Sequence, residues 1–127
     1  MQTTPLTGLS WYHLKLGPGA DLFQGLRDFF KQQGLKRAFV LSCIGSLQKA
    51  VLAFPKTKEI PPQIESLAIE GLFELNGIAG EVWQEAGEIK VHLHGSLTKA
   101  GKEVFGGAIN QGTEIFKLAE MVIAGLK

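Results

Sequence analysis

The sequence lacks features that mark several large classes of protein. It has one cysteine among 127 residues, so no disulfide can form within the chain, which fits a reducing compartment. Thirteen Lys and Arg residues nearly balance twelve Asp and Glu residues, and the net charge is +1. A chain that binds nucleic acid tightly on its own normally carries a clear excess of positive charge. The charge balance therefore argues against strong non-specific DNA binding.

Long hydrophobic runs are absent as well. No apolar stretch approaches the roughly 20 residues that a transmembrane helix needs. The start, MQTTPLTG, lacks the basic stretch and apolar core of a secretory signal peptide. We therefore expect a cytoplasmic protein that makes no contact with a membrane. Repeats and low-complexity segments are also missing, and a chain of 127 residues with 45% hydrophobic composition suits a single domain over residues 1–127.

The first third of the chain predicts a strand followed by a helix. LSWYHLKL, residues 9–16, alternates apolar and polar residues, as a half-buried strand does. The next segment carries an apolar stripe at helical spacing, formed by Leu22, Leu26, Phe29 and Phe30. Asp21 suits the start of this helix and Gly34 suits its C-terminal cap.

The middle of the chain is typical of antiparallel sheet. RAFVLSCIGSLQKAVLAF, residues 37–54, predicts two strands joined by a tight turn or a bulge at Gly45 and Ser46. PKTKEIPP, residues 55–62, contains three prolines that remove sheet donors, so we expect a loop. QIESLAIEGLFELNG, residues 63–77, alternates with one slip near Gly71, as a bulged strand would. The pair Asn76 and Gly77 then predicts a hairpin turn.

Two segments raise a choice between alternatives. Cys43 lies inside the apolar stretch AFVLSCIG, and a buried structural thiol is favoured over a reactive one. Residues 117–126 fit an apolar helical stripe and fit a buried strand equally well, so periodicity does not separate the two.

His92 and His94 form the most distinctive local pattern. Two residues apart on a strand, they project from the same face with Cα atoms about 6.5–7 Å apart. Two imidazoles so placed can converge on one ion, but zinc takes at least a third protein ligand. The same pattern suits histidines that are hydrogen-bonded in a cleft or at a subunit interface. In a catalytic version, one imidazole would transfer a proton while Glu74 or Glu120 orients it.

Four stretches of the sequence, taken in order, resemble a known family. They are LKLGPGADL (14–22), AFVLSCIGSLQKAVLAF (38–54), HLHGSL (92–97) and GKEVFGGAINQGTEIFKLAEMVI (101–123). They resemble the successive motifs of the PPC (plant and prokaryote conserved) domain over nearly the whole chain. This domain stands alone in bacteria and archaea, and accompanies AT-hook motifs in plant nuclear proteins.

The resemblance implies an α+β fold with a largely antiparallel sheet of about seven strands, one or two packed helices and assembly as a homotrimer. It also favours a strand for residues 117–126. The Arg-Gly-Arg-Pro core of an AT-hook is absent. The resemblance therefore implies a binding or regulatory module, in preference to an enzyme, that works through protein partners and associates with DNA through those partners or a weak surface.

The resemblance also bears on a metal site. Some prokaryotic relatives carry a third histidine directly after the paired glycine, which completes a three-histidine set suited to zinc. The matching position here is Ala108, after Gly106 and Gly107, and alanine cannot coordinate a metal. The alternative function is a small-ligand or metal-binding protein, or an enzyme, with a cleft at His92 and His94. In that cleft Gly106 and Gly107 would let a ligand approach the backbone, or would mark a bulge.

Overall fold

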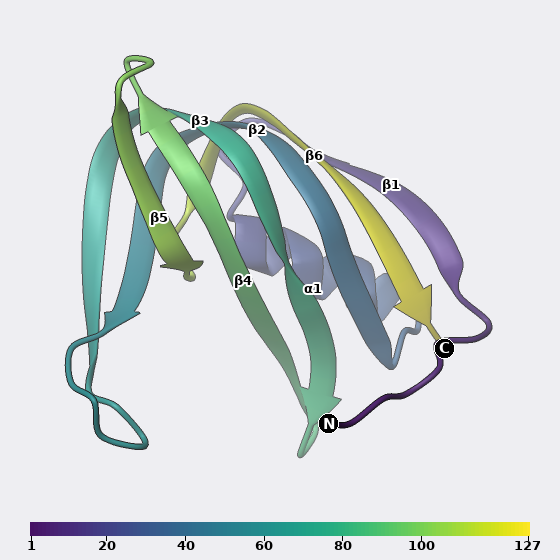
Figure 1. Ribbon diagram of the computed structural model, residues 1–127. Helices are drawn as coiled ribbons and strands as arrows, with labels where there is room; N and C mark the ends of the chain where they lie inside the picture. The colour runs from purple at the N-terminus through teal and green to yellow at the C-terminus, as the bar shows by residue number, and fades with distance from the viewer.

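The computed structural model describes residues 1–127 as one helix and six strands. The strands form a single antiparallel sheet in the order β1-β6-β2-β3-β4-β5, which curves strongly and holds α1 on its concave side (Figure 1). The predicted α+β class is confirmed, with six strands in place of about seven. The elements in chain order are β1 (Ser10–Leu16), α1 (Leu22–Gln32), β2 (Arg37–Pro55), β3 (Ile64–Glu85), β4 (Glu88–Lys99), β5 (Glu103–Ile109) and β6 (Glu114–Leu126).

The helix α1 forms where the sequence predicts it. The Oδ1 atom of Asp21 accepts hydrogen bonds from the backbone N–H groups of Phe23 and Gln24, at 2.9 and 3.0 Å, and so caps the first turn. Gly34 follows the last turn with φ of 64°, a conformation that favours glycine. The apolar stripe is buried against the inner, concave face of the sheet, and Phe29 packs edge-to-face on Tyr12 of β1. The helix therefore closes the core on one side.

Strand β2 runs without a turn through the point where the sequence allows either a turn or a bulge. Its register with β6 slips on both sides of Gly45, so the bulge is the alternative that the structure adopts. A Cβ atom at Gly45 would lie 2.0 Å from the carbonyl oxygen of Leu118. Glycine is therefore required there for β6 to pass.

The predicted hairpin at Asn76 and Gly77 is wrong. Both residues lie inside β3, where they form a bulge opposite Ser96 of β4. The local Asn-Gly signal is overridden because β3 stays paired with β4 on both sides of the bulge. The slip predicted near Gly71 is confirmed, since Gly71 and Leu72 face the single residue Gln48. The turns at either end of β4 instead use the pairs Ala86–Gly87 and Ala100–Gly101, all with positive φ.

One further pairing shapes the molecule. The distal half of β2 pairs with β5 as well as with β3, through Leu52 with Ile109 and Ala53 with Ala108. Strands β2, β3, β4 and β5 thus close into a ring, while β1 remains an open edge of the sheet. Closure brings the end of β2 and the loop after it beside β5. Ala53 and Ala108, which are 55 positions apart in the sequence, are paired there.

The end of the chain and the cysteine complete the core. Residues 114–126 form β6, which confirms the strand that the family resemblance favours. Cys43 is fully buried, and burial raises the pKa of its thiol to about 12. No helix in the structure combines the length and the apolar character that crossing a membrane would take.

Candidate functional site

The two histidines of β4 meet on the outer face of the sheet. Leu93, between them, points into the core and is 1% exposed, whereas both imidazoles are exposed. Their Nε2 atoms lie 3.0 Å apart and their rings meet edge to face. At this distance one Nε2 donates a hydrogen bond and the other accepts it when both rings are neutral. The alternation of β4 therefore brings the pair together as the sequence predicts.

A cavity of about 330 Å³ opens beside this pair. Its walls come from the end of β2, the following loop, the start of β3, and β5, which the β2–β5 pairing draws together. Apolar side chains form most of its surface, and the two imidazoles are the polar side chains that face it. The lining residues are Ala53, Phe54, Pro55, Pro62, Ile64, His92, His94, Gly107 and Ala108.

The paired glycines serve different purposes. Gly107 lines the cavity and has φ of 125°, which a side chain would strain. Gly106 does not line it. A Cβ atom at Gly106 would lie 3.0 Å from the carbonyl oxygen of Gly95, so this glycine serves the close approach of β4 and β5. The structure thus places one of the two predicted glycines at the cavity.

The carboxylate nearest in register to the pair is Glu81, which the sequence does not single out. Glu81 on β3 lies directly opposite His92, and its Oε2 atom accepts hydrogen bonds from Arg37 Nη2 at 2.6 Å and Nε at 3.2 Å. Glu74 lies opposite Thr98 and Glu120 pairs with Lys15 of β1 at 3.7 Å. The expectation that Glu74 or Glu120 orients an imidazole is therefore wrong.

One chain does not supply a zinc site. Ala108 lies opposite His94, so the position of the third histidine of some relatives does face the pair, but it presents only a methyl group. No group of three His, Cys, Asp or Glu side chains is arranged to hold a metal ion. His13, on β1, and buried Cys43 do not join the pair. Two imidazoles fall short of the three protein ligands that zinc takes.

The apolar wall is the part of the site that the sequence does not reveal. Phe54, Pro62 and Ile64 lie in a predicted strand end and loop, and no motif connects them to β4. Residues 51–64 are no richer in apolar side chains than the chain as a whole, so composition gives no signal either. Only the closure of the ring by β2 and β5 gives those residues a common location with the histidines.

Comparison with known proteins gives one family. The family model of the Plants and Prokaryotes Conserved (PCC) domain matches residues 4–127. Among curated proteins, the chain is 34% identical over 123 residues to the bifunctional protein GlmU of Synechococcus sp. (strain JA-3-3Ab). That match covers 97% of this chain and 18% of GlmU, so the chain spans less than a fifth of that relative.

Solved structures share the fold over almost the whole chain. A PPC protein from Pyrococcus horikoshii matches with a TM-score of 0.85 and 28% identity, covering 99% of this chain and 85% of that one. A metal-containing protein from Archaeoglobus fulgidus has a TM-score of 0.85 at 23% identity, covering 99% and 86%. A proposed DNA-binding protein from Bacteroides thetaiotaomicron matches with a TM-score of 0.81 and 15% identity, covering 96% of this chain and 81% of that one. At 23% and 15% identity, the last two structures indicate a shared fold and nothing more.

Proposed function

This chain belongs to the Plants and Prokaryotes Conserved domain family, and we propose that it works as a homotrimeric binding module whose ligand site is the cavity at His92 and His94. One observation carries the proposal: two imidazoles in mutual contact face an apolar cavity of about 330 Å³. Apolar walls with a few convergent polar groups are the usual composition of a small-molecule site. The ligand class that fits is a small apolar molecule with one hydrogen-bonding group.

Thermal unfolding in the presence of a probe tests this site. Benzyl alcohol has an aromatic body and a single hydroxyl, and a molecule that binds only the folded state raises the unfolding temperature. We expect that rise to disappear in the double variant His92→Ala, His94→Ala. His13→Ala is the matched control, because His13 is an exposed outer-face histidine on β1, distant from β4 in the sheet. A rise that survives in the double variant would exclude the histidines from the site.

The homotrimer is supported by an uncovered apolar surface. Four large side chains project from the outer face of β1, β2 and β6, where no second layer packs: Trp11, Leu41, Ile44 and Val122, which we call the outer apolar patch. Their exposed fractions run from 40% to 63%. Exposed apolar side chains gathered on one face are typical of an interaction site. Light scattering should give a mass about three times that of one chain.

DNA association through partner proteins or a weak surface is the second candidate function. The Bacteroides structural neighbour, a proposed DNA-binding protein, is the observation that favours it. With thirteen basic against twelve acidic residues and a net charge of +1, the chain carries little overall positive charge to attract phosphate. We expect the logarithm of the DNA association constant to fall only slightly with the logarithm of salt concentration. A steep slope would indicate many direct phosphate contacts and would favour DNA recognition by this chain itself.

A further inference from the structure

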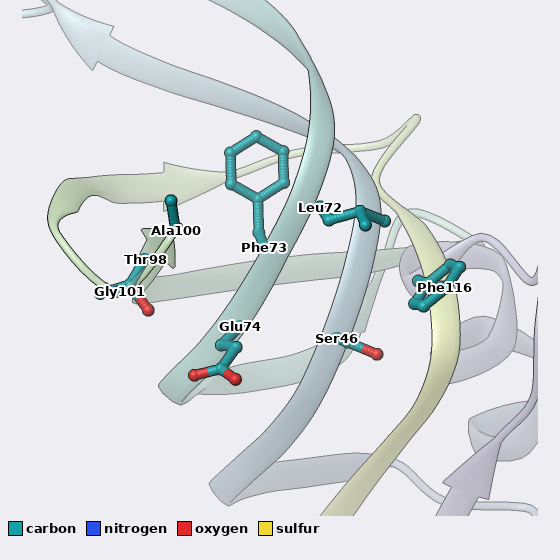
Figure 2. Close-up of a pocket in the computed structure, with 8 residues that line it drawn as sticks. All are labelled: Ser46, Leu72, Phe73, Glu74, Thr98, Ala100, Gly101 and Phe116. Carbon is teal, nitrogen blue, oxygen red and sulfur yellow. The ribbon is translucent and has the colours of Figure 1, made fainter.

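We propose a second ligand site, separate from the histidine cavity, which binds a polyhydroxylated molecule of monosaccharide size. The site is a hollow of about 450 Å³ bordered by β2, β3, β6 and the β4–β5 turn (Figure 2). Ser46, Glu74 and Thr98 lie opposite one another on β2, β3 and β4, so their side chains share the outer face. Leu72 and Phe116 border the same hollow.

The backbone around the hollow is irregular in three places. Strand β3 bulges at residues 71–72 and again at 76–77, on either side of Glu74. The β2–β6 pairing slips between Gly45 and Leu47, beside Ser46. Bulges bend a strand and redirect its side chains, and they occur often beside binding sites. Here they flank Glu74, which itself stays in register with Ser46 and Thr98.

The polar groups of the hollow are only partly engaged. Ser46 Oγ accepts a hydrogen bond from the backbone N–H of Lys117 at 3.2 Å, and Thr98 Oγ1 accepts one from Asn76 Nδ2 at 3.2 Å. Each hydroxyl therefore keeps its own O–H free to donate. Glu74 is exposed and takes no part in the three ion pairs of the chain or in any side-chain hydrogen bond. The hollow thus offers two donors and one carboxylate acceptor to a ligand.

The apolar border completes the match to a sugar-like ring. Phe116 is 46% exposed and Leu72 is 60% exposed, and Figure 2 shows both on the same side of Glu74 as Ser46. A pyranose or cyclitol carries C–H groups that pack on such surface and hydroxyls on its rim. Few polar groups against apolar surface are what a small-molecule site usually contains.

The arrangement of donors and acceptors favours hydroxyls over other ligand groups. A hydroxyl both donates to the Glu74 carboxylate and accepts from Ser46 or Thr98. An ammonium group only donates, so both O–H groups would bond to water and not to the ligand. An anionic ligand would be repelled by the uncompensated charge of Glu74. A neutral polyol satisfies all three protein groups at once.

NMR titration with D-glucose, D-mannose and myo-inositol tests the site. With at least one of these probes, we expect concentration-dependent shifts of the amide signals of Ser46, Glu74 and Thr98. Glu74→Gln should weaken binding by about tenfold or more, because a hydrogen bond to a charged group is replaced by one to a neutral amide. Glu65→Gln is the matched control: the same charge is removed from an exposed position of β3 outside the hollow.

Three results would overturn the proposal. The first is an absence of shifts with all three polyols. The second is an equal affinity of the wild type and Glu74→Gln for the binding polyol, with both proteins folded. The third is a higher affinity for n-propylamine than for any of the polyols at the same amides, since an amine ligand would then replace the polyol. None of these results bears on the histidine cavity, which shares no residue with the hollow.

Discussion

The two faces of the curved sheet have different chemistry. The inner face packs on α1 and holds a continuous core of 23 buried residues, almost all of them Leu, Ile, Val, Phe, Ala or Met. The outer face has no second layer and carries the histidine pair, the outer apolar patch and the Glu74 hollow. The inner face therefore accounts for folding, and the outer face carries every feature that we assign to assembly or ligands. Substitutions on the two faces should have effects of different kinds.

The largest loss of stability should follow a truncation on the inner face. Phe30 is 1% exposed, so Phe30→Ala should lower the free energy of unfolding by about 3–5 kcal/mol through lost burial and a cavity. Val104→Ala, at a β5 residue that is 70% exposed, should change it by less than about 0.5 kcal/mol. Urea unfolding at one protein concentration measures both. Equal losses would remove the distinction between the faces.

A charge in the outer apolar patch should affect assembly more than folding. Ile44 is 58% exposed, so Ile44→Lys should leave the subunit folded but reduce the solution mass about threefold, to that of a monomer. Val104→Lys places the same charge on an exposed apolar residue outside the patch, and should leave the mass unchanged. Size-exclusion chromatography with light scattering gives both masses. Should Ile44→Lys keep the wild-type mass, the patch is not the interface.

The cap of α1 should contribute a smaller share of stability. Asp21 accepts three backbone hydrogen bonds, from Phe23, Gln24 and, through Oδ2 at 2.8 Å, Gly112. Asp21→Ala removes all three acceptors, and we expect a loss of about 1–2 kcal/mol. Asp21→Asn keeps one carboxamide oxygen at the helix start, so it should cost less than the alanine variant. Urea unfolding measures the free energy of unfolding of both variants and of the wild type. Equal values for all three proteins would mean that the cap does not contribute to stability.

The smallest effect at neutral pH should come from the buried thiol. Burial raises the pKa of Cys43 to about 12, so the folded protein keeps its thiol neutral and protected. In the unfolded chain the pKa of a cysteine thiol is about 8.5. The contribution of this thiol to the free energy of unfolding is therefore fully present below about pH 8.5, and it is lost as the pH rises toward the pKa of the folded protein. Iodoacetamide at pH 8 should label Cys43 in urea and spare the native protein; rapid native labelling would contradict this burial.

The sequence predicts the inner face better than the outer one. The stripe of α1, the alternation of β1 and the bulge near Gly71 follow from local periodicity, and burial of Cys43 follows from its apolar neighbours. The hairpin at Asn76 and Gly77 fails because pairing with β4 on both sides continues β3 through the turn signal, as a bulge. Local preference is a weak guide where tertiary pairing continues across it.

The candidate site is predicted only in part, for a similar reason. The convergence of His92 and His94 follows from the two-residue period of a strand, and the resemblance to relatives indicates the position of Ala108. The wall formed by Phe54 and Ile64 depends on the β2–β5 pairing, which no local pattern encodes. The Glu74 hollow depends in turn on long-range register, because Ser46 of β2 and Thr98 of β4 lie opposite Glu74 only when the three strands pair.

Native mass spectrometry of the protein purified without a histidine tag reports subunit number and bound metal together, and so tests both the homotrimer and the metal-free histidine pair. We expect a homotrimer that carries no zinc, in which the His92 and His94 pair serves a cavity for small molecules. A monomer would contradict the assembly. A trimer with one zinc ion per chain would contradict the metal-free site and would show that a neighbouring subunit supplies the ligand that Ala108 lacks.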